Sequence, residues 1–451
     1  MLKINNPDLS AEAKDKLIQR ALERKQHKLS FGNEVDVSIA VPETIKQQIS
    51  EEHYRFDLHP GYTQLRIVND GAKMMGIKSP FFKLHEGSAG ATTRIANKEY
   101  INYASYNYLG FSGHPAVTQA AIDAINIYGT SVSASRLVSG ERPIHRQLEQ
   151  EIASAYNVDD AIVFVSGHAT NVTTIGYLFG HKDLILHDEL IHNSALQGSI
   201  LSGARRLSFP HNDWRVLDAI LTEQRHQFER VLIVVEGIYS MDGDYPELPK
   251  FIEIKQKHHA FLMVDDAHSF GVMGAKGLGI REHFHLDGKD VDIWMGTLSK
   301  SLAGCGGYIA GETALIEHLK FLAPGFLYSV GMSPPLAAAS LTALQHLHKE
   351  PERVKSLQER GHQFIKLAKA AKIDIGNSSG LAVIPAITGS SIKAAQLSAA
   401  MFEHGINVQP ILYPAVSEKS ARLRFFISSQ HTEKQINDTV QVLAAELARL
   451  A

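Results

Sequence analysis

The fold class is decided by the stretch FLMVDDAHSFG, which covers residues 261–271. It opens with apolar residues that no polar residue interrupts, and such a run is typical of a strand buried on both faces of a parallel sheet. Two carboxylates, Asp265 and Asp266, follow directly. Because ligands bind beyond the carboxyl ends of strands in open α/β sheets, this point of the chain is a candidate for a functional site.

Short apolar runs of the same kind recur along the chain and alternate with segments of helical periodicity. They are Ala161–Val165, Leu184–Leu186, Leu207–Phe209, Val231–Val235 and Ile293–Met295. This alternation predicts an α/β fold with a large, mostly parallel sheet that helices cover on both faces.

The C-terminal part of the chain has a different pattern. After the Pro334–Pro335 pair we expect a long helical passage over 336–371. A smaller α+β unit should follow, with a helix over 391–404, strands near 406–411 and 421–428, and a last helix over 432–450.

The N-terminal part lacks the strand–helix alternation. Residues 11–28 have the spacing of a surface or docking helix, and 30–95 show no regular pattern. We therefore expect an N-terminal extension and arm over 1–112, a large cofactor-binding α/β domain over 113–346, and a small C-terminal α+β domain over 347–451. The extension is rich in aromatic residues, which favours a packed element over a loosely attached tail.

Composition excludes several classes of protein. The 451 residues include 48 acidic and 45 basic side chains, a net charge of −3, so a mainly electrostatic nucleic-acid binder is excluded. No apolar run is long enough to span a membrane, and residues 1–10 lack the apolar core of a secretory signal. The single cysteine, Cys305, excludes a disulfide framework and a multi-cysteine metal cluster. These features predict a cytoplasmic enzyme without a metal site.

The segment GTLSKSLAG, residues 296–304, places Lys300 among hydroxyls and glycines directly after an apolar run. It lacks the G-x-x-x-x-G-K-[ST] spacing of a phosphate loop. A lysine that forms a Schiff base needs a desolvated amine, and burial beside the end of a sheet lowers its pKa. The pattern indicates such a lysine, with neighbouring hydroxyls that grip a cofactor phosphate; an ordinary loop lysine is the alternative.

Asp265 ends its strand in a place where a carboxylate needs a partner. A pyridinium nitrogen is suitable, because the carboxylate keeps the ring protonated and able to accept electrons. His268 would then reach the phenolic oxygen of the same ring. The D-x-x-H spacing also fits two metal ligands, but no third ligand accompanies it. A purely structural role for Asp265 is the other alternative.

Three further clusters carry weaker signals. The turn at 165–169, which contains Gly167 and His168, could receive a phosphate on its backbone N–H groups. His192 lies near a helix start, where an imidazole could stack on an aromatic ring, although a lone histidine is more often structural. Strand alternation puts Arg422 and Arg424 on one face, which suits a substrate carboxylate or a structural salt bridge.

Together the ordered motifs resemble the α-oxoamine synthase family of fold-type-I pyridoxal-phosphate (PLP) enzymes, which includes serine palmitoyltransferase, aminolevulinate synthase and amino-oxononanoate synthase. The resemblance runs from about residue 100 to the C-terminus. It is carried by NYASYNYLGF (102–111), SRLVSGERPIHRQLE (135–149), HND (211–213), EGIYSMDGD (236–244), VDDAHSFGVMGAKGLG (264–279), GTLSKSLAGCGGYIAG (296–311) and ARLRFFISSQHT (421–432).

The resemblance implies PLP as cofactor and assigns a role to each matching residue. Lys300 would form the Schiff base, Asp265 would pair with the pyridinium nitrogen, and His192 would stack on the ring. His268 and Ser240 would contact the phenolic oxygen. The phosphate contacts would be Gly167, His168, Thr297 and, from a second subunit, Ser329.

The substrate contacts and the assembly also follow from the resemblance. Arg424, rather than Arg422, would bind the substrate carboxylate, and Asn107 of the neighbouring subunit would point at the substrate. A homodimer with the active site at its interface is therefore expected. Asp266 departs from the glutamate that is common in the family. Residues 129–134 depart from the family's glycine-rich pattern, so the preferred amino acid is not predicted.

The implied reaction is a decarboxylating condensation of an amino acid with an acyl thioester, giving an α-amino ketone, CO2 and a thiol. The acyl donor would be an acyl-CoA or an acyl carrier protein. One alternative keeps the cofactor but changes the reaction to transamination or retro-aldol cleavage. Another is a non-catalytic binding subunit, which would be expected to lack the lysine.

Overall fold

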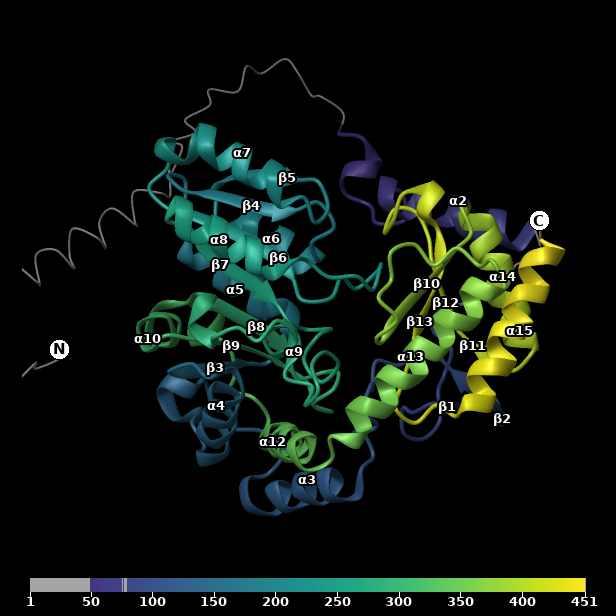
Figure 1. Ribbon diagram of the computed structural model, residues 1–451, viewed down its shortest axis with the longest axis horizontal. Helices are drawn as coiled ribbons and strands as arrows, with labels where there is room; N and C mark the ends of the chain where they lie inside the picture. Colours follow the sequence, from purple (N-terminus) through teal and green to yellow (C-terminus); the bar gives the residue numbers. More distant parts are fainter. Residues whose placement is uncertain (1–48, 75, 77–78, 451) are drawn as a thin grey trace, which may run out of the picture. The chain divides into compact units, whose positions relative to one another are not determined.

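The computed structural model describes residues 49–74, 76 and 79–450 (Figure 1). Contacts divide the chain into one unit that ends at Gly71 and a second that runs from Ala72 to Ala451. The predicted helix over 11–28 lies outside the described residues. The division into parts at residues 112 and 346 remains a prediction.

In the short unit, the described chain forms a 3-10 turn, η1 (Glu51–His53), and the beginning of helix α2 (Pro60–Met74). The expectation that 30–95 has no regular structure is therefore wrong for this stretch. Pro60 stands at the first helical position, where its missing N–H costs no hydrogen bond. Leu65 and Val68 follow at helical spacing, but both side chains are more than half exposed. They therefore form no buried apolar face that would have indicated the helix in the sequence.

Seven strands form the central sheet, in the order β3-β9-β8-β7-β6-β4-β5. Only β9 runs antiparallel to its neighbours, β3 and β8, so the prediction of a large, mostly parallel sheet is confirmed. The strands are β3 (Asp160–Phe164), β4 (Leu184–Asp188), β5 (Arg205–Phe209), β6 (Val231–Glu236), β7 (Phe261–Asp265), β8 (Ile293–Thr297) and β9 (Gly307–Gly311).

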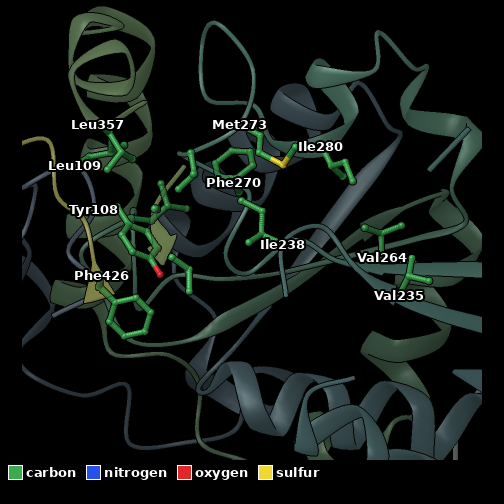
Figure 2. Packing of buried hydrophobic residues seen from close by; sticks show 14 of the residues in the cluster. Tyr108, Leu109, Val235, Ile238, Val264, Phe270, Met273, Ile280, Leu357 and Phe426 are labelled. Atoms are coloured by element: carbon green, nitrogen blue, oxygen red, sulfur yellow. The ribbon is translucent and has the colours of Figure 1, made fainter. Parts of the chain in front are cut away.

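The sheet is buried on both faces, as the uninterrupted apolar runs predict. Along β6, Ile233 and Val235 pack into one hydrophobic cluster, whereas Leu232 and Val234 pack into another on the opposite side. Val235 lies opposite Val264 of β7, and Figure 2 shows the two side chains together. Because successive side chains of a strand point to opposite faces, the two hydrophobic clusters pack on opposite faces of one sheet.

Helices with residues in the first cluster cover one face of the sheet: α4 (Pro143–Tyr156), α7 (Trp214–Gln224), α8 (Leu248–His258) and α12 (Pro334–Lys349). The second cluster contains residues from the helices of the other face: α5 (Gly167–Leu178), α6 (Asn193–Leu201), α10 (Thr313–Leu322) and α11 (Pro324–Leu327). The α5 and α6 N-termini follow β3 and β4 directly. Their first N–H groups therefore face the carboxyl edge of the sheet.

The passage expected over 336–371 consists of two helices, α12 and α13 (Glu352–Ala370). Pro351 separates them, because a proline lacks the N–H that would continue α12. The sheet that follows has the order β10-β13-β12, built from β10 (Val383–Ile387), β12 (Gln409–Ile411) and β13 (Arg422–Phe426). It is accompanied by α14 (Ser391–Glu403) and by α15 (Glu433–Arg449), which Thr432 caps.

A third sheet joins two distant parts of the sequence. It pairs β1 (Thr92–Ile95) and β2 (Lys98–Asn102) with β11 (Ile406–Asn407). The remaining described elements are α3 (Pro115–Tyr128), the π-helical turn η2 (Arg136–Gly140), η3 (Arg225–Gln227), α9 (Gly279–His283), η4 (Gly288–Asp290) and η5 (Glu418–Ser420). Among the described helices, none combines the length and the apolar composition that crossing a membrane requires.

Candidate active site

A cavity of about 360 Å³ lies where β6, β7 and β8 end, at the carboxyl edge of the central sheet. Its volume falls within the range of small-molecule sites. All the site residues predicted from the sequence line it except Asn107 and Ser329. Those that line it are Gly167, His168, His192, Ser240, Asp265, His268, Thr297, Lys300 and Arg424.

Asp265 presents a fixed carboxylate to this cavity. Asn171 Nδ2 donates to its Oδ2 over 2.8 Å, and the Ala267 N–H donates to its Oδ1 over 3.1 Å. Asn171 comes from α5, was not singled out in the sequence, and keeps its Oδ1 buried without a partner among the described residues. Hydrogen bonds to a carboxylate favour its charged form, so Asp265 suits a protonated ring nitrogen.

The second acid of the motif, Asp266, faces the core instead. It is fully buried, and the Tyr156 hydroxyl donates to its Oδ2 over 3.0 Å. The Ser269 hydroxyl and the Ile280 N–H also bond to this carboxyl group. Burial raises the pKa of Asp266 to about 7. Of the two neighbouring acids, only Asp265 faces the cavity.

Lys300 lies in the loop between β8 and β9, at the wall of the cavity. Burial lowers the pKa of its amine to about 8. Thr297 Oγ1 donates to the Gly306 carbonyl over 3.0 Å and accepts from the Ser299 N–H over 3.2 Å, which ties the two ends of the loop together. The loop therefore holds a weakly basic amine beside a fixed carboxylate.

The N-terminus of α5 forms the opposite wall. Ser166 caps the helix, with its Oγ accepting from the Ala169 N–H over 3.4 Å. The first N–H groups of a helix have no partner within the helix and attract anions. A Cβ on Gly167 would approach Thr297 Oγ1 to 3.0 Å, so glycine allows the start of α5 to lie close to Thr297. The first N–H groups of α5 therefore fit a phosphate group.

His192 caps α6 beside the cavity. Its Nδ1 lies 2.7 Å from Ser194 Oγ, which sets the orientation of the ring. The His192 N–H donates to Glu236 Oε1 over 2.5 Å, and the Ser240 N–H donates to Glu236 Oε2 over 3.3 Å. Glu236 thus joins the two loops that carry His192 and Ser240. The sequence indicates Glu236 only as an acid directly after the apolar run 231–235, and Glu236 was not among the predicted site residues.

Glu236 is 2% exposed and lies opposite Asp265 in the β6–β7 pairing. Burial first, and the charge of Asp265 second, raise the pKa of Glu236 well above its usual range. Two carboxylates so close in a buried place cannot both ionise readily. The raised pKa of Glu236 favours its neutral form.

His268 and the aromatic residues around it close another side of the cavity. The Tyr108 hydroxyl lies 2.7 Å from His268 Nδ1, and the Phe426 ring stacks on the imidazole at 6.1 Å between centroids. Figure 2 shows Tyr108 and Phe426 next to each other. Burial lowers the pKa of His268 well below its usual range, so the ring is neutral.

The two arginines of β13 point to the same side but have different partners. Arg422 Nη1 donates to Asp242 Oδ1 over 2.6 Å, a mostly buried ion pair. Arg424 has no carboxylate partner among the described residues; its Nη1 donates to the Ser240 carbonyl over 3.1 Å, and its guanidinium lies 4.5 Å from the Phe426 ring centroid. Its remaining N–H groups can bind a carboxylate in the cavity.

Asn107 and Ser329 lie outside the cavity. Asn107 Nδ2 donates to the Ala89 carbonyl over 2.8 Å and its Oδ1 accepts from the Ser112 N–H over 3.2 Å, so the side chain shapes its own loop. Ser329 lines a separate small cavity next to Phe326. Both residues were expected to act from a second subunit, and that role remains a prediction.

A second cavity of about 380 Å³ lies near the starts of β7 and β8. Its lining includes an exposed ion pair, Lys289 with Asp159 at 2.8 Å, and apolar side chains such as Phe179 and Leu315. It lies away from the carboxyl ends of the parallel strands. Chemistry, not size, therefore selects the Lys300 cavity as the active site.

Comparisons with known proteins show the family of this chain. Residues 98–443 match the family described as aminotransferase class I and II. An 8-amino-7-oxononanoate synthase of Symbiobacterium thermophilum is 38% identical over 375 residues, 83% of this chain and 95% of the relative.

Two solved structures are also similar. A serine palmitoyltransferase from S. paucimobilis, with a bound PLP–myriocin adduct, has a TM-score of 0.83 and 26% identity and covers 86% of this chain and 98% of its own. An 8-amino-7-oxononanoate synthase from Francisella tularensis has a TM-score of 0.67 and 26% identity, over 78% of this chain and 98% of its own.

This chain is an α-oxoamine synthase. The family predicted from the ordered motifs is thereby confirmed, and so are the fold-type-I architecture and the dependence on PLP. The enzyme is a PLP-dependent acyltransferase that condenses an amino acid with an acyl thioester and releases CO2. The cavity fits the cofactor, because it combines a fixed carboxylate, a weakly basic lysine and a helix N-terminus open to a phosphate.

Changing Glu236 tests whether it acts as a neutral bridge between two loops. Glu236→Gln keeps one oxygen acceptor and replaces the other with an NH2 group, so one of the His192 and Ser240 N–H groups keeps its partner, and PLP affinity should fall by less than in Glu236→Ala. Glu236→Ala leaves both N–H groups without a partner, which costs about 1–3 kcal/mol per buried group and should weaken PLP binding at least tenfold. Equilibrium dialysis measures both. Equal losses in the two variants would contradict the bridge.

The lowered pKa of Lys300 predicts how PLP capture depends on pH. The neutral amine is the nucleophile, so the capture rate should rise about tenfold per pH unit below the pKa of about 8 and level off above it. Stopped-flow absorbance of apoenzyme mixed with PLP measures this rate. Nα-acetyl-lysine is the control, and its rate should keep rising towards its ordinary pKa of about 10.4. A protein profile that follows this control would refute a depressed pKa.

Proposed function

We propose that the Lys300 cavity is where this enzyme holds PLP and joins the amino acid to the acyl group. The observation that carries the proposal is the meeting of three groups in one cavity: the amine of Lys300, the fixed carboxylate of Asp265, and the guanidinium of Arg424, which has no carboxylate partner among the described residues. A decarboxylating condensation needs a base, an electron sink and a group that binds the substrate carboxylate. Lys300 would be the base and Arg424 would bind the carboxylate, while Asp265 would pair with the ring nitrogen of PLP, which is the electron sink.

PLP, when bound, withdraws electrons from the α-carbon of the amino acid. The carboxylate of Asp265, which Asn171 holds in place, would pair with the ring nitrogen. Lys300 would take the α-proton on Nζ, because burial has brought its pKa close to neutral pH. The neutral state of Glu236 leaves Asp265 as the charge that faces the ring.

Arg424 would bind the substrate carboxylate and release it as CO2 forms. The fork of a guanidinium matches a carboxylate with two parallel N–H···O bonds. Arg422 is committed to Asp242 and keeps the neighbouring loop at Ser240 in place. The difference in partners, and not the strand face, distinguishes the two arginines.

The remaining residues would hold the cofactor. Gly167, His168 and Thr297 would bind the phosphate, and His268 and Ser240 the phenolic oxygen. The ring of His192, whose orientation is set by Ser194, would stack on the cofactor and position the substrate carboxylate and new carbonyl. Each of these side chains or backbone groups lines the same cavity.

A homodimer would complete this site, with Asn107 and Ser329 contributed by the second subunit. In support, large apolar side chains are exposed on the stretches near Ser329 and η2. Val138 is 79% exposed, and Tyr328 is 86% exposed. Apolar side chains left in water in such a group are typical of a protein interface.

The acyl donor remains open between an acyl-CoA and an acyl carrier protein, and one panel decides between them. Each amino acid is first scored by the change in PLP absorbance, and thiol and CO2 release are then measured with acyl-CoA and with acyl carrier protein of the same chain length. Stoichiometric CO2 and thiol support the condensation. Keto-acid formation without thiol release would instead support transamination.

Removing the guanidinium tests the grip on the substrate. Arg424→Gln should raise the KM for the amino acid by about 10–100-fold, because hydrogen bonds to a charged group are worth about 1.5–3 kcal/mol. The KM for the acyl donor should remain within about twofold. Steady-state kinetics with each substrate varied in turn measures both constants. A larger effect on the acyl donor than on the amino acid would contradict the assignment.

A further inference from the structure

A cluster of two histidines and one glutamate lies outside the Lys300 cavity, where α3 meets α12. His114 caps the N-terminus of α3, and His346 and Glu350 lie one helical turn apart at the end of α12. Helices α3 and α12 pack against each other. We propose that His114, His346 and Glu350 bind one divalent transition-metal ion, of the Zn²⁺ type, which fastens α3 to α12.

The distances within the cluster suit such an ion. His346 Nδ1 lies 2.5 Å from Glu350 Oε1, and His114 Nε2 lies 3.6 Å from the same oxygen. The candidate ligand atoms all fall within 4.8 Å of one another. With metal–ligand bonds of about 2.0–2.2 Å, a tetrahedral site needs its ligand atoms roughly 3.4 Å apart. Shifts of about 1 Å at side-chain ends are therefore sufficient.

Glu350 is held so that one of its oxygens stays available to the ion. Arg353 Nε donates to Oε2, and Arg353 Nη1 donates to the Leu109 carbonyl over 3.0 Å. Oε1 is left facing the two histidines. Ligands of metal ions are commonly oriented in this way by outer partners.

Access and surroundings also fit a metal ion. The ring of Phe111 contacts both imidazoles edge to face, at 5.9 Å from His114 and 6.4 Å from His346. The three ligand side chains are between 16% and 22% exposed, so an ion and its water can reach them. His114 and Arg353 also line an adjoining cavity of about 510 Å³, into which a fourth, water-filled position can open.

The chemistry of the set selects the class of ion. Imidazole nitrogens favour zinc, copper and nickel over calcium and magnesium, and two histidines with one carboxylate leave room for one water on zinc. Binding through His114 Nε2 places the ring proton on Nδ1 and breaks the 3.3 Å bond from the Ala116 N–H. The loss of this long cap bond opposes metal binding.

Zinc binding to the holoenzyme tests the proposal directly. Calorimetric titration with ZnCl2, in buffer without a chelator, should show one equivalent that each of three variants loses: His114→Asn, His346→Gln and Glu350→Gln. Asparagine retains a helix cap at position 114, so α3 should stay intact. The control is His348→Gln, which removes a histidine of the same helix outside the cluster.

We expect Zn²⁺ affinity to fall more than tenfold in each variant, since even outer partners of metal ligands are worth about 10–100-fold. Zinc should also raise the midpoint of thermal unfolding of the parent and of His348→Gln, and leave that of the three variants unchanged. PLP absorbance confirms that each variant is folded and loaded. Equal zinc affinity in the parent and in the folded variants, or no zinc binding by the parent, overturns the proposal.

Discussion

The register between β6 and β7 is the constraint on which the active site depends. It sets Glu236 directly opposite Asp265 at the carboxyl edge of the sheet, so two acids share a place that excludes water. Burial and the charge of Asp265 raise the pKa of Glu236 well above its usual range. Asp265 accepts bonds from Asn171 and Ala267, whereas Glu236 accepts bonds from the two loops that carry His192 and Ser240. A shift of either strand by one residue would turn its acid to the other face.

The C-terminal sheet adds the part of the site that the central sheet cannot supply. Arg422 and Arg424 reach back to the loop that follows β6, where they bond to the carbonyls of Met241 and Ser240. One arginine is neutralised by Asp242, and the other keeps its capacity for an outside carboxylate. The Arg422–Asp242 ion pair thus holds the loop to which the guanidinium of Arg424 also bonds.

The metal site that we propose differs from the active site in how its parts come together. Most residues of the candidate active site follow strands of the central sheet, so a general rule about strand ends locates them. His114 and His346 lie on separate helices, and only the packing of α3 on α12 brings them close. Ligand spacing along the chain therefore did not predict this site. Of the three ligands, only His346 and Glu350 have a local spacing, i,i+4, that the sequence shows.

The sequence by itself determined the mostly parallel sheet and the position of Lys300 and Asp265, because both follow from local pattern: uninterrupted apolar runs, and polar residues directly after them. The ordered motifs also determined the family. Tertiary structure alone decided that the pKa of Glu236 is raised and that Arg422 is already paired. These properties depend on burial and on partners far away in the chain, and neither is encoded in the spacing of nearby residues.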